Sequence, residues 1–458
     1  MTATTPPPLR TSAPAEKQGA VARAQRMLSE FEAARASRRE VVAVAQKQRM
    51  AVFLLNLGGP ETGADVEPFL YNLFADPDII RLPPAIGGAQ TALAWLIAKR
   101  RAPRSREAYD SIGGGSPITR FTNAQAQLLE DALNEDSDDV DFKCYVAMRY
   151  WKPFTDEALE RAAKDNCESA VVLPLYPHFS ISTTGSSLRA LLAEMQASHP
   201  TLFRSHTVVP SWHRSPGYVN LVAKLVANEL ALLPPPASED EPAPVVLFSA
   251  HGVPVSYIEQ QGDPYKRHIE ETFALVSKKV LETHYANDPT PPSFELSFQS
   301  RVGPVEWLRP YTDDALVDIA SNRKVKRLVV VPISFVSEHI ETLEEIDIEY
   351  RQVAENAGIQ HWRRVPALNL EPEFIDELKF QVQNALYNQP AVSTCEACVV
   401  NSFDLDNGQN FFADVIPEVQ DDVIDLNSRI AAIAIAATAL FELLMNSRAI
   451  HVFGLGAV

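Results

Sequence analysis

The side chains best suited to acid–base or metal chemistry follow two apolar stretches in the second half of the chain. His251 comes directly after residues 245–250, and His339 and Glu341 come shortly after residues 327–335. A neutral imidazole accepts a proton or contacts a metal near pH 7, and a nearby carboxylate can share either task. A lone histidine is more often structural than catalytic. Two histidines and a carboxylate at the ends of two predicted parallel strands favour a site that moves protons or contacts a metal.

Glu341 also begins a row of acidic residues. Glu341, Glu345 and Glu349 are spaced four residues apart on a predicted helix, so they form one ridge of like charge beside His339. Like charges at this spacing repel weakly, and solvation usually accommodates them. Beside a histidine, such a ridge can also pass a hard divalent cation between oxygen ligands. The ligands are too acidic, and the cysteines too distant in the sequence, for a closed zinc site.

Other segments have residues that could bind a ligand. The glycines at 58–59 and 113–115 allow a close approach of the backbone to a ligand. Neither segment has the spacing of a dinucleotide or P-loop motif, and tight turns explain them equally well. Arg149 and Tyr150 follow the apolar run 143–148. A guanidinium there could hold a carboxylate, or it could cap a neighbouring loop.

These residues need a framework that brings the ends of several strands together. From residue 51 onward, short runs rich in Val, Ile, Leu and Phe alternate with longer amphipathic stretches, as in βαβ units around a parallel sheet. Ligands bind such sheets at the carboxyl ends of the strands. We therefore predict an α/β fold with two similar lobes of four strands each, in which a proline-rich surface loop at 233–244 precedes the sheet of the second lobe. The predicted strands are residues 51–57, 143–148, 169–175, 203–209, 245–250, 294–300, 327–335 and 359–365.

The composition excludes several classes of protein. At roughly 100–200 residues per domain, the 458 residues allow two or three domains. The 41 Lys and Arg against 59 Asp and Glu give a net charge of −18, which argues against nucleic acid and favours a cationic or neutral small-molecule ligand. The 4 cysteines exclude a disulfide scaffold. No uninterrupted apolar stretch reaches about 20 residues, which excludes a polytopic membrane protein.

Both ends of the chain differ from the predicted lobes. Residues 1–49 are basic and contain serine, which predicts a targeting segment followed by a short helix. The alternative is a solvated, disordered N-terminal tail without a targeting function. At the other end, an acidic linker at 391–425 precedes a largely apolar helix at 426–451. The apolar run from 430 to 445 would extend about 24 Å, short of the ~30 Å hydrocarbon core, and Glu442 lies within it. A marginal membrane span is the prediction.

Several motifs together resemble the ferrochelatase family, in the expected order over residues 51–387. The resemblance implies two Rossmann-like, doubly wound lobes with parallel four-stranded sheets, at 50–210 and 211–390, around a porphyrin cleft. It also implies insertion of Fe²⁺ into protoporphyrin IX, with release of two protons, to form protoheme. The motifs are LLNLGGPET at 54–62, SIGGGSPI at 111–118, residues 173–187, FSAHGVP at 248–254, FQSRVGP at 298–304 and residues 331–350.

The resemblance implies roles for individual residues. His251 is the central candidate for catalysis and metal contact, with Glu341 opposite it and His339 in support. Glu345 and Glu349 become a route for iron. Five further residues are implied to contact the porphyrin, and the two apolar ones would present their faces to the ring. These five are Arg149, Tyr150, Ser116, Trp307 and Phe335.

Some relatives carry a [2Fe–2S] cluster on four cysteines, and this chain departs from that pattern. Cys395 and Cys398 occupy two of the positions, but Phe403 and Ile181 occupy the others. Because such a cluster needs thiolate ligands, we predict none. The resemblance implies no prosthetic group, since Fe²⁺ is a substrate.

The C-terminal segment resembles the chlorophyll a/b-binding-like helix of cyanobacterial and plastid ferrochelatases. The likeness lies in Asn427 and Arg429, but Ile424 stands where those relatives have Glu, which argues against chlorophyll binding. A plain membrane or dimer helix explains the segment as well. With the transit-like N-terminus, it favours the chloroplast, on the stromal side of the thylakoid or envelope membrane; the mitochondrion is the alternative.

Two other functions stay open. One is a chelatase for another tetrapyrrole, such as coproporphyrin, and the other is a non-catalytic, membrane-tethered carrier of tetrapyrrole or iron. The presence of His251 and Glu341 favours catalysis, because a carrier needs neither a base nor an acid. The expected partners are protoporphyrin IX, Fe²⁺ and a membrane, without nucleic acid, and a homodimer is left open.

Overall fold

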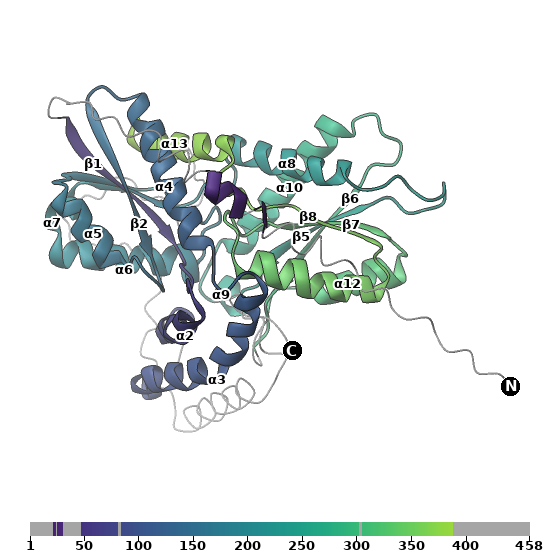
Figure 1. The fold of residues 1–458 in the computed structure, drawn as a ribbon, viewed down its shortest axis with the longest axis horizontal. Helices are drawn as coiled ribbons and strands as arrows, with labels where there is room; N and C mark the ends of the chain where they lie inside the picture. The colour runs from purple at the N-terminus through teal and green to yellow at the C-terminus, as the bar shows by residue number, and fades with distance from the viewer. Residues whose placement is uncertain (1–21, 24, 31–46, 81–83, 302–304, 388–458) are drawn as a thin grey trace.

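The computed structural model describes residues 22–23, 25–30, 47–80, 84–301 and 305–387. They form two parallel four-stranded sheets, ordered β2-β1-β3-β4 and β6-β5-β7-β8, which confirms the predicted α/β fold with two similar lobes (Figure 1). The strands are β1 (Gln48–Asn56), β2 (Val140–Met148), β3 (Ser169–Pro174), β4 (His206–Val208), β5 (Val245–His251), β6 (Ser293–Gln299), β7 (Arg327–Pro332) and β8 (His361–Arg364).

All eight predicted strands are present, and the fourth is one of those whose boundaries differ from the prediction. The prediction began this strand at residue 203, but Pro200–Arg204 form the short helix α7 and only His206–Val208 pair with β3. Proline suits the first turn of a helix, where its missing N–H is not needed, so Pro200 starts α7 rather than an edge strand.

Helices cover the faces of both sheets, and one of them joins the lobes. The helix α13 packs against α4 of the first lobe and α8 of the second, above the junction in Figure 1. The helices used below are α2 (Val66–Ala75), α3 (Gln90–Ser111), α4 (Ile118–Glu135), α5 (Thr155–Lys164), α6 (Ser186–Ser198), α8 (Pro216–Ala231), α9 (Val255–Glu259), α10 (Tyr265–His284), α11 (Thr312–Val317), α12 (Arg351–Ala357) and α13 (Pro372–Tyr387).

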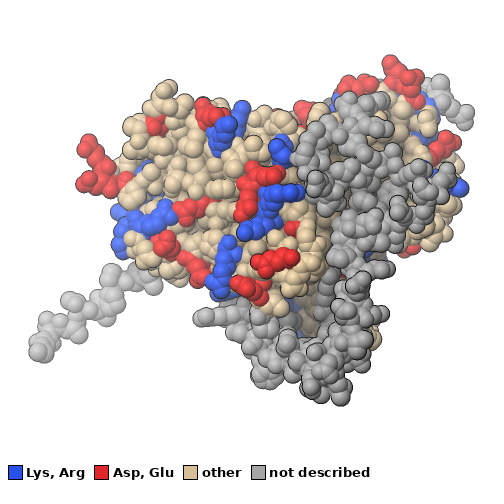
Figure 2. Space-filling model, turned by 180° about the vertical axis from the view of Figure 1, so that it is seen from behind, with Lys and Arg blue, Asp and Glu red and all other residues tan. Residues whose placement is uncertain are grey.

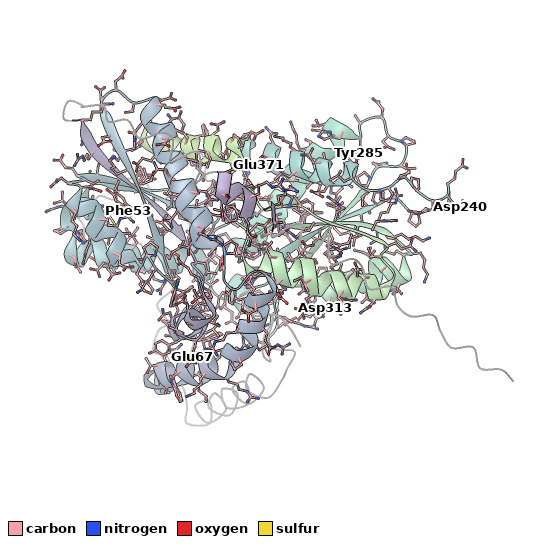
Figure 3. The ribbon with its side chains drawn as sticks, in the orientation of Figure 1. Phe53, Glu67, Asp240, Tyr285, Asp313 and Glu371 are labelled. Carbon is pink, nitrogen blue, oxygen red and sulfur yellow. The ribbon has the colours of Figure 1, made fainter. Side chains whose placement is uncertain are left out.

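The apolar run of β1 is continuous because both of its faces are covered, as is usual in parallel sheets. Val52 and Leu54 point to one side, into a cluster that contains residues of α4 and α8 and extends to β5 and β7. Phe53 and Leu55 point to the other side, against α5 and α6. Figure 3 places Phe53 inside the first lobe. The first of these clusters is shared, so the two lobes have a common core.

The two glycine-rich segments pack against each other. A Cβ on Gly115 would lie 2.0 Å from the carbonyl oxygen of Glu61, and a Cβ on Gly59 would lie 2.7 Å from Cβ of Ser116. The backbone N–H of Ser116 donates to the Pro60 carbonyl at 2.7 Å. Close approach of two chain segments therefore explains these glycines, in agreement with the tight-turn interpretation.

The proline-rich stretch at 233–244 is a loop without helix or strand, as predicted. Asp240 is exposed on it, at the edge of the molecule in Figure 3. On the face seen in Figure 2, basic and acidic side chains are interspersed over the described surface. On this face, the described surface has no basic stripe of the kind that nucleic-acid binding requires.

In the part of the chain that the structure describes, no helix is both long and apolar enough to cross a membrane. The predicted acidic linker at 391–425, the helix at 426–451 and the Cys395–Cys398 pair lie outside the described residues. Most of the predicted targeting segment at 1–49 lies outside them as well.

Replacing Arg364 of β8 with methionine is expected to destabilise the fold strongly. Its guanidinium pairs with Glu338 at 3.0 Å and Asp347 at 3.4 Å, and both Arg364 and Glu338 are almost fully buried. Loss of one partner leaves an unpaired buried charge, which costs about 3–5 kcal/mol. Urea unfolding measures this change. Lys164→Met, which removes an exposed pair with Glu160, is the control, with a loss of about 0.5 kcal/mol or less. Equal losses in both variants would contradict the prediction.

Candidate active site

A cavity of about 420 Å³ lies between the lobes, at the carboxyl ends of the parallel strands. Asn56 and Leu57 line it at the end of β1, His251 to Pro254 at the end of β5, and Ser334 to Ser337 after β7. Its size is typical of a small-molecule site. The position agrees with the rule that α/β sheets bind ligands where their strands end.

His251 and Glu341 meet at the wall of this cavity. The Nδ1 atom of His251 lies 2.9 Å from Oε2 of Glu341, and Gln299 Nε2 donates to the same oxygen at 3.2 Å. Burial acts to raise the pKa of Glu341, but His251 and these hydrogen bonds lower it below its usual value. Glu341 is therefore a carboxylate at neutral pH. Since a carboxylate only accepts, Nδ1 of His251 carries the proton and Nε2 is the basic nitrogen.

The backbone of His251 is held on both sides. Its N–H donates to Ser334 Oγ at 3.0 Å, and its carbonyl accepts from the hydroxyl of Tyr265 at 2.9 Å. Tyr265 and Ser334 also contact each other through their hydroxyls at 2.8 Å. These contacts fix the end of β5, so the imidazole is presented to the cavity in one orientation.

His339 lines the same cavity and is neutral. Burial lowers its pKa, although Glu341 and Glu338 act to raise it. Its Nδ1 atom lies 3.1 Å from the Ser337 carbonyl, which can only accept. The ring of Phe335 packs 4.4 Å from that of His339 and 6.4 Å from that of His251. The structure thus brings together the three residues predicted from the strand ends.

The acidic ridge is present, but the helix that carries it is not the regular α-helix expected. Residues Glu341–Tyr350 form a π-helix, a rare form that is frequent at functional sites. Glu345 is fully buried and accepts from Ser300 Oγ at 2.9 Å. Burial and then the nearby Glu341 raise the pKa of Glu345 well above its usual value. Of the three glutamates of this ridge, Glu341 lines the cavity, whereas Glu345 and Glu349 do not.

The residues expected to contact the porphyrin divide into two groups. Trp307 and Phe335 line the cavity, whereas Arg149, Tyr150 and Ser116 do not. Ser116 lines a separate cavity of about 290 Å³, where its Oγ accepts from the N–H of Ile118. The local sequence gives no sign of this division, because it depends on where other loops pack.

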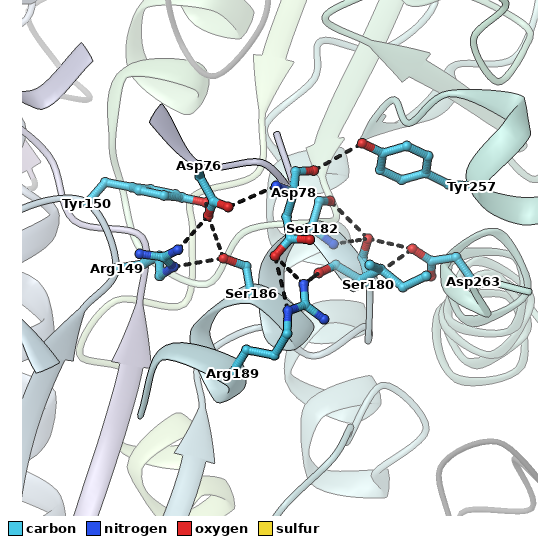
Figure 4. Close-up of polar contacts among 11 residues, drawn as sticks. Asp76, Asp78, Arg149, Tyr150, Ser180, Ser182, Ser186, Arg189, Tyr257 and Asp263 are labelled. Carbon is cyan, nitrogen blue, oxygen red and sulfur yellow. Dashed lines mark hydrogen bonds and ion pairs between the residues drawn. The ribbon is translucent and has the colours of Figure 1, made fainter. Parts of the chain in front are cut away.

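Arg149 and Tyr150 both bind the buried carboxylate of Asp76. Arg149 Nη2 and the Tyr150 hydroxyl each donate to Asp76 Oδ2 at 2.8 Å, and Ser186 Oγ donates to it at 2.6 Å (Figure 4). Asp76 in turn accepts from the N–H of Asp78 at 2.9 Å. The two predicted ligand-binding residues therefore support the loop that follows α2.

This loop forms one wall of the cavity and touches the other lobe. Asp78, Ile79 and Ile80 line the cavity. The Tyr257 hydroxyl, from α9 of the second lobe, donates to the Asp78 carbonyl at 3.0 Å, and Arg189 pairs with the Asp78 carboxylate (Figure 4). The wall is thus anchored from both lobes.

His178 and Arg101 are among the polar lining residues that sequence reasoning missed. His178 lies shortly after the end of β3 and His251 is the last residue of β5, so the same strand-end argument would have found His178. Burial, His213 and His268 lower the pKa of His178 well below its usual value. Arg101 lies within α3, where no local pattern distinguishes it from the neighbouring Arg100.

Over the described ranges, no group of three or more His, Cys, Asp and Glu is arranged to hold a metal ion. His251, His339 and Glu341 are among the residues that line the cavity, and they offer two imidazoles and one carboxylate. Such a set can contact a divalent cation without enclosing it.

The buried Glu344 is expected to make stability depend on pH. Burial and then Glu349 raise its pKa to about 8, although Arg104 opposes the shift. Between about pH 4.5 and 8 the folded chain keeps this proton while the unfolded chain loses it, so the free energy of unfolding falls as pH rises. Glu344→Gln should flatten this dependence in urea unfolding at pH 5, 6.5 and 8. The exposed Glu282→Gln should not, and an unchanged slope in Glu344→Gln would contradict the assignment.

Comparisons with known proteins identify the family of this chain. The family model described as Ferrochelatase matches residues 49–386. Ferrochelatase-2, chloroplastic, of Oryza sativa subsp. indica is 50% identical over 352 residues, which are 76% of this chain and 64% of that protein. The protein of the same name from Arabidopsis thaliana is 49% identical and covers 77% and 67%. The Ferrochelatase of Nostoc sp. is 50% identical and covers 77% and 86%. The match thus spans about two thirds of the plant proteins, and the chain belongs to the ferrochelatase family.

Proposed function

We propose that this chain is a metal chelatase that inserts Fe²⁺ into protoporphyrin IX and releases two protons, the final step of heme biosynthesis. The observation that supports this most directly is the His251–Glu341 pair on the wall of a largely apolar cavity between the lobes. Membership of the ferrochelatase family supports the class of reaction.

Metal insertion requires a base, because both inner pyrrole N–H groups must lose their protons. Nε2 of His251 accepts one proton, and the resulting imidazolium stays paired with the Glu341 carboxylate 2.9 Å away. His339 is a second neutral imidazole on the same wall and supports this step. The two protons released balance the two positive charges that Fe²⁺ brings to the ring.

The walls of the cavity suit a flat apolar ring with an acidic edge. Trp307, Phe335, Ile79 and Ile80 provide apolar surface. Among the described lining residues, Arg101 is the only Lys or Arg. Burial and then Arg104 lower the pKa of Arg101 to about 10, so it stays charged at neutral pH and can hold a propionate.

Iron approaches as a hydrated cation and must be held loosely enough to be released. His251 and Glu341 offer one imidazole and one carboxylate, which suit Fe²⁺ in transit. Glu345 and Glu349 form the proposed route towards them. The raised pKa of Glu345 means that a cation arriving there exchanges with a proton, which keeps the buried site close to neutral.

The proposed location is the chloroplast, on the stromal side of the thylakoid or envelope membrane. The plant relatives, whose names describe them as chloroplastic, support the organelle. The N-terminal targeting segment, attachment to the membrane through residues 426–451 and a homodimer are further proposals. The mitochondrion remains the alternative location. We propose no [2Fe–2S] cluster and no bound chlorophyll.

The activity is tested by measuring metal insertion with the full chain, using protoporphyrin and coproporphyrin side by side. We expect turnover of protoporphyrin with Fe²⁺, and His251→Ala should reduce kcat by roughly 10²–10⁴-fold, as is typical for loss of a general base. The exposed His284→Ala is the control and should keep full activity. Preference for coproporphyrin would replace the proposed substrate, and no turnover of either would indicate a carrier.

The role of Arg101 is tested separately. Arg101→Leu should raise the porphyrin KM roughly 10-fold, because a charge-assisted hydrogen bond contributes about 1.5–3 kcal/mol. The neighbouring Arg100 is exposed, so Arg100→Leu is a matched control. A porphyrin whose propionates are esterified should bind equally to wild type and Arg101→Leu. Unchanged KM for the free acid would show that Arg101 does not hold the propionate.

A further inference from the structure

Gln125 crosses from one lobe to the other beside the cavity. It lies on α4 of the first lobe and is completely buried. Its Nε2 atom donates to Ser337 Oγ at 2.9 Å and to the Asn369 carbonyl at 2.8 Å, both in the second lobe. The side-chain amide therefore donates both of its hydrogens to acceptors more than 200 residues away in the chain.

The orientation of this amide follows from its partners. A backbone carbonyl only accepts, so the atom facing Asn369 must be the nitrogen. The other amide atom, Oε1, has no hydrogen-bond partner in the described structure. A buried carbonyl oxygen without a partner is unfavourable, so the donor contacts decide the placement of Gln125.

Ser337, the first partner, orients the ring of His339. The Ser337 carbonyl is the acceptor for His339 Nδ1 at 3.1 Å. With the proton on Nδ1, Nε2 is the lone-pair nitrogen of a ring that lines the cavity. A shift of Ser337 would move this carbonyl and release the ring to its other tautomer.

Asn369, the second partner, binds the residues on either side of Ser337. Its N–H donates to the Val336 carbonyl and its Oδ1 accepts from the N–H of Glu338, both at 2.9 Å. It has a φ of +46°, in the left-handed region that asparagine adopts more readily than most residues. Both contacts of Gln125 therefore act on the short segment that presents His339 and Glu341.

We infer that Gln125 is a positioning residue for metal insertion: by joining the lobes through Ser337 and Asn369, it holds His339 in the tautomer with a basic Nε2. The kinetic part of this inference rests on the proposed function. The structural part does not, because the tautomer of His339 can be measured without substrate.

The test uses the full chain with Gln125→Met, which keeps the length of the side chain and removes both donors. Gln127 lies on the exposed side of the same helix and donates to Asp131, so Gln127→Met is the matched control. Ring nitrogens are observed by NMR after ¹⁵N labelling of the 10 histidines, with His339 assigned by its loss in His339→Asn. We expect the Nδ1–H tautomer in wild type and Gln127→Met, and a mixture in Gln125→Met.

In the insertion assay, Gln125→Met should lower kcat about 10-fold while the porphyrin KM changes less than about twofold, since misplacement affects the chemical step more than binding. Ser337→Ala removes Oγ but keeps the carbonyl, so it should have a smaller effect. The double variant, Gln125→Met with Ser337→Ala, should have a kcat no lower than that of Gln125→Met alone. If Gln125→Met does not fold, Ser337→Ala is measured in its place.

Wild-type kcat together with an unchanged His339 tautomer in Gln125→Met would overturn the inference. An equal loss of kcat and of porphyrin binding with an unchanged tautomer would overturn it too, because that result indicates a displaced lobe. If wild type inserts no metal, the proposed function fails while the tautomer measurement still decides the role of Gln125.

Discussion

The hydrogen bond between His251 and Glu341 depends on the whole second sheet. His251 is the last residue of β5, and Gln299, which donates to the same carboxylate, is the last residue of β6. These two residues pair directly in the parallel register. Glu341 begins the π-helix that follows β7, the other neighbour of β5. Three consecutive positions of the sheet therefore converge on one carboxylate, and parallel pairing is what places their ends at the same edge.

The same arrangement shifts the pKa values of two similar side chains in opposite directions. Glu341 and Glu345 lie on the same π-helix and both are buried. Glu341 faces an imidazole and an amide donor, so its pKa is lowered despite burial. Burial and then the nearby carboxylates raise the pKa of Glu345, although the Ser300 hydroxyl donates to it and opposes the shift. Neighbouring carboxyl groups in different environments can take different roles, one as a charged partner and the other as a proton carrier.

The cavity needs both lobes, and three kinds of contact hold the lobes in place. A shared apolar core runs from β1 to β5 and β7. The loop after α2 is anchored through Asp76 to Arg149 in the first lobe, and through the Asp78 carbonyl to Tyr257 in the second. Gln125 binds the turn that carries His339. The apolar core supplies most of the stabilisation, while the polar contacts determine where the cavity-lining groups lie.

The amino-acid sequence by itself was sufficient for the eight strands, the two lobes and the group of His251, His339 and Glu341. Apolar periodicity reports local structure, and the ends of parallel strands must meet at one edge, so these features need no knowledge of distant contacts. Other positions were decided only by the tertiary structure. Arg149 and Tyr150 bind Asp76, and Ser116 lines a second cavity. Arg101 lines the main cavity, and Gln125 binds the turn beside it. In each case the surroundings of the side chain include segments distant in the sequence, and the packing of those segments is not encoded in any local pattern. The π-helix at Glu341 is a similar case, because its residues have the same spacing pattern as an ordinary amphipathic α-helix.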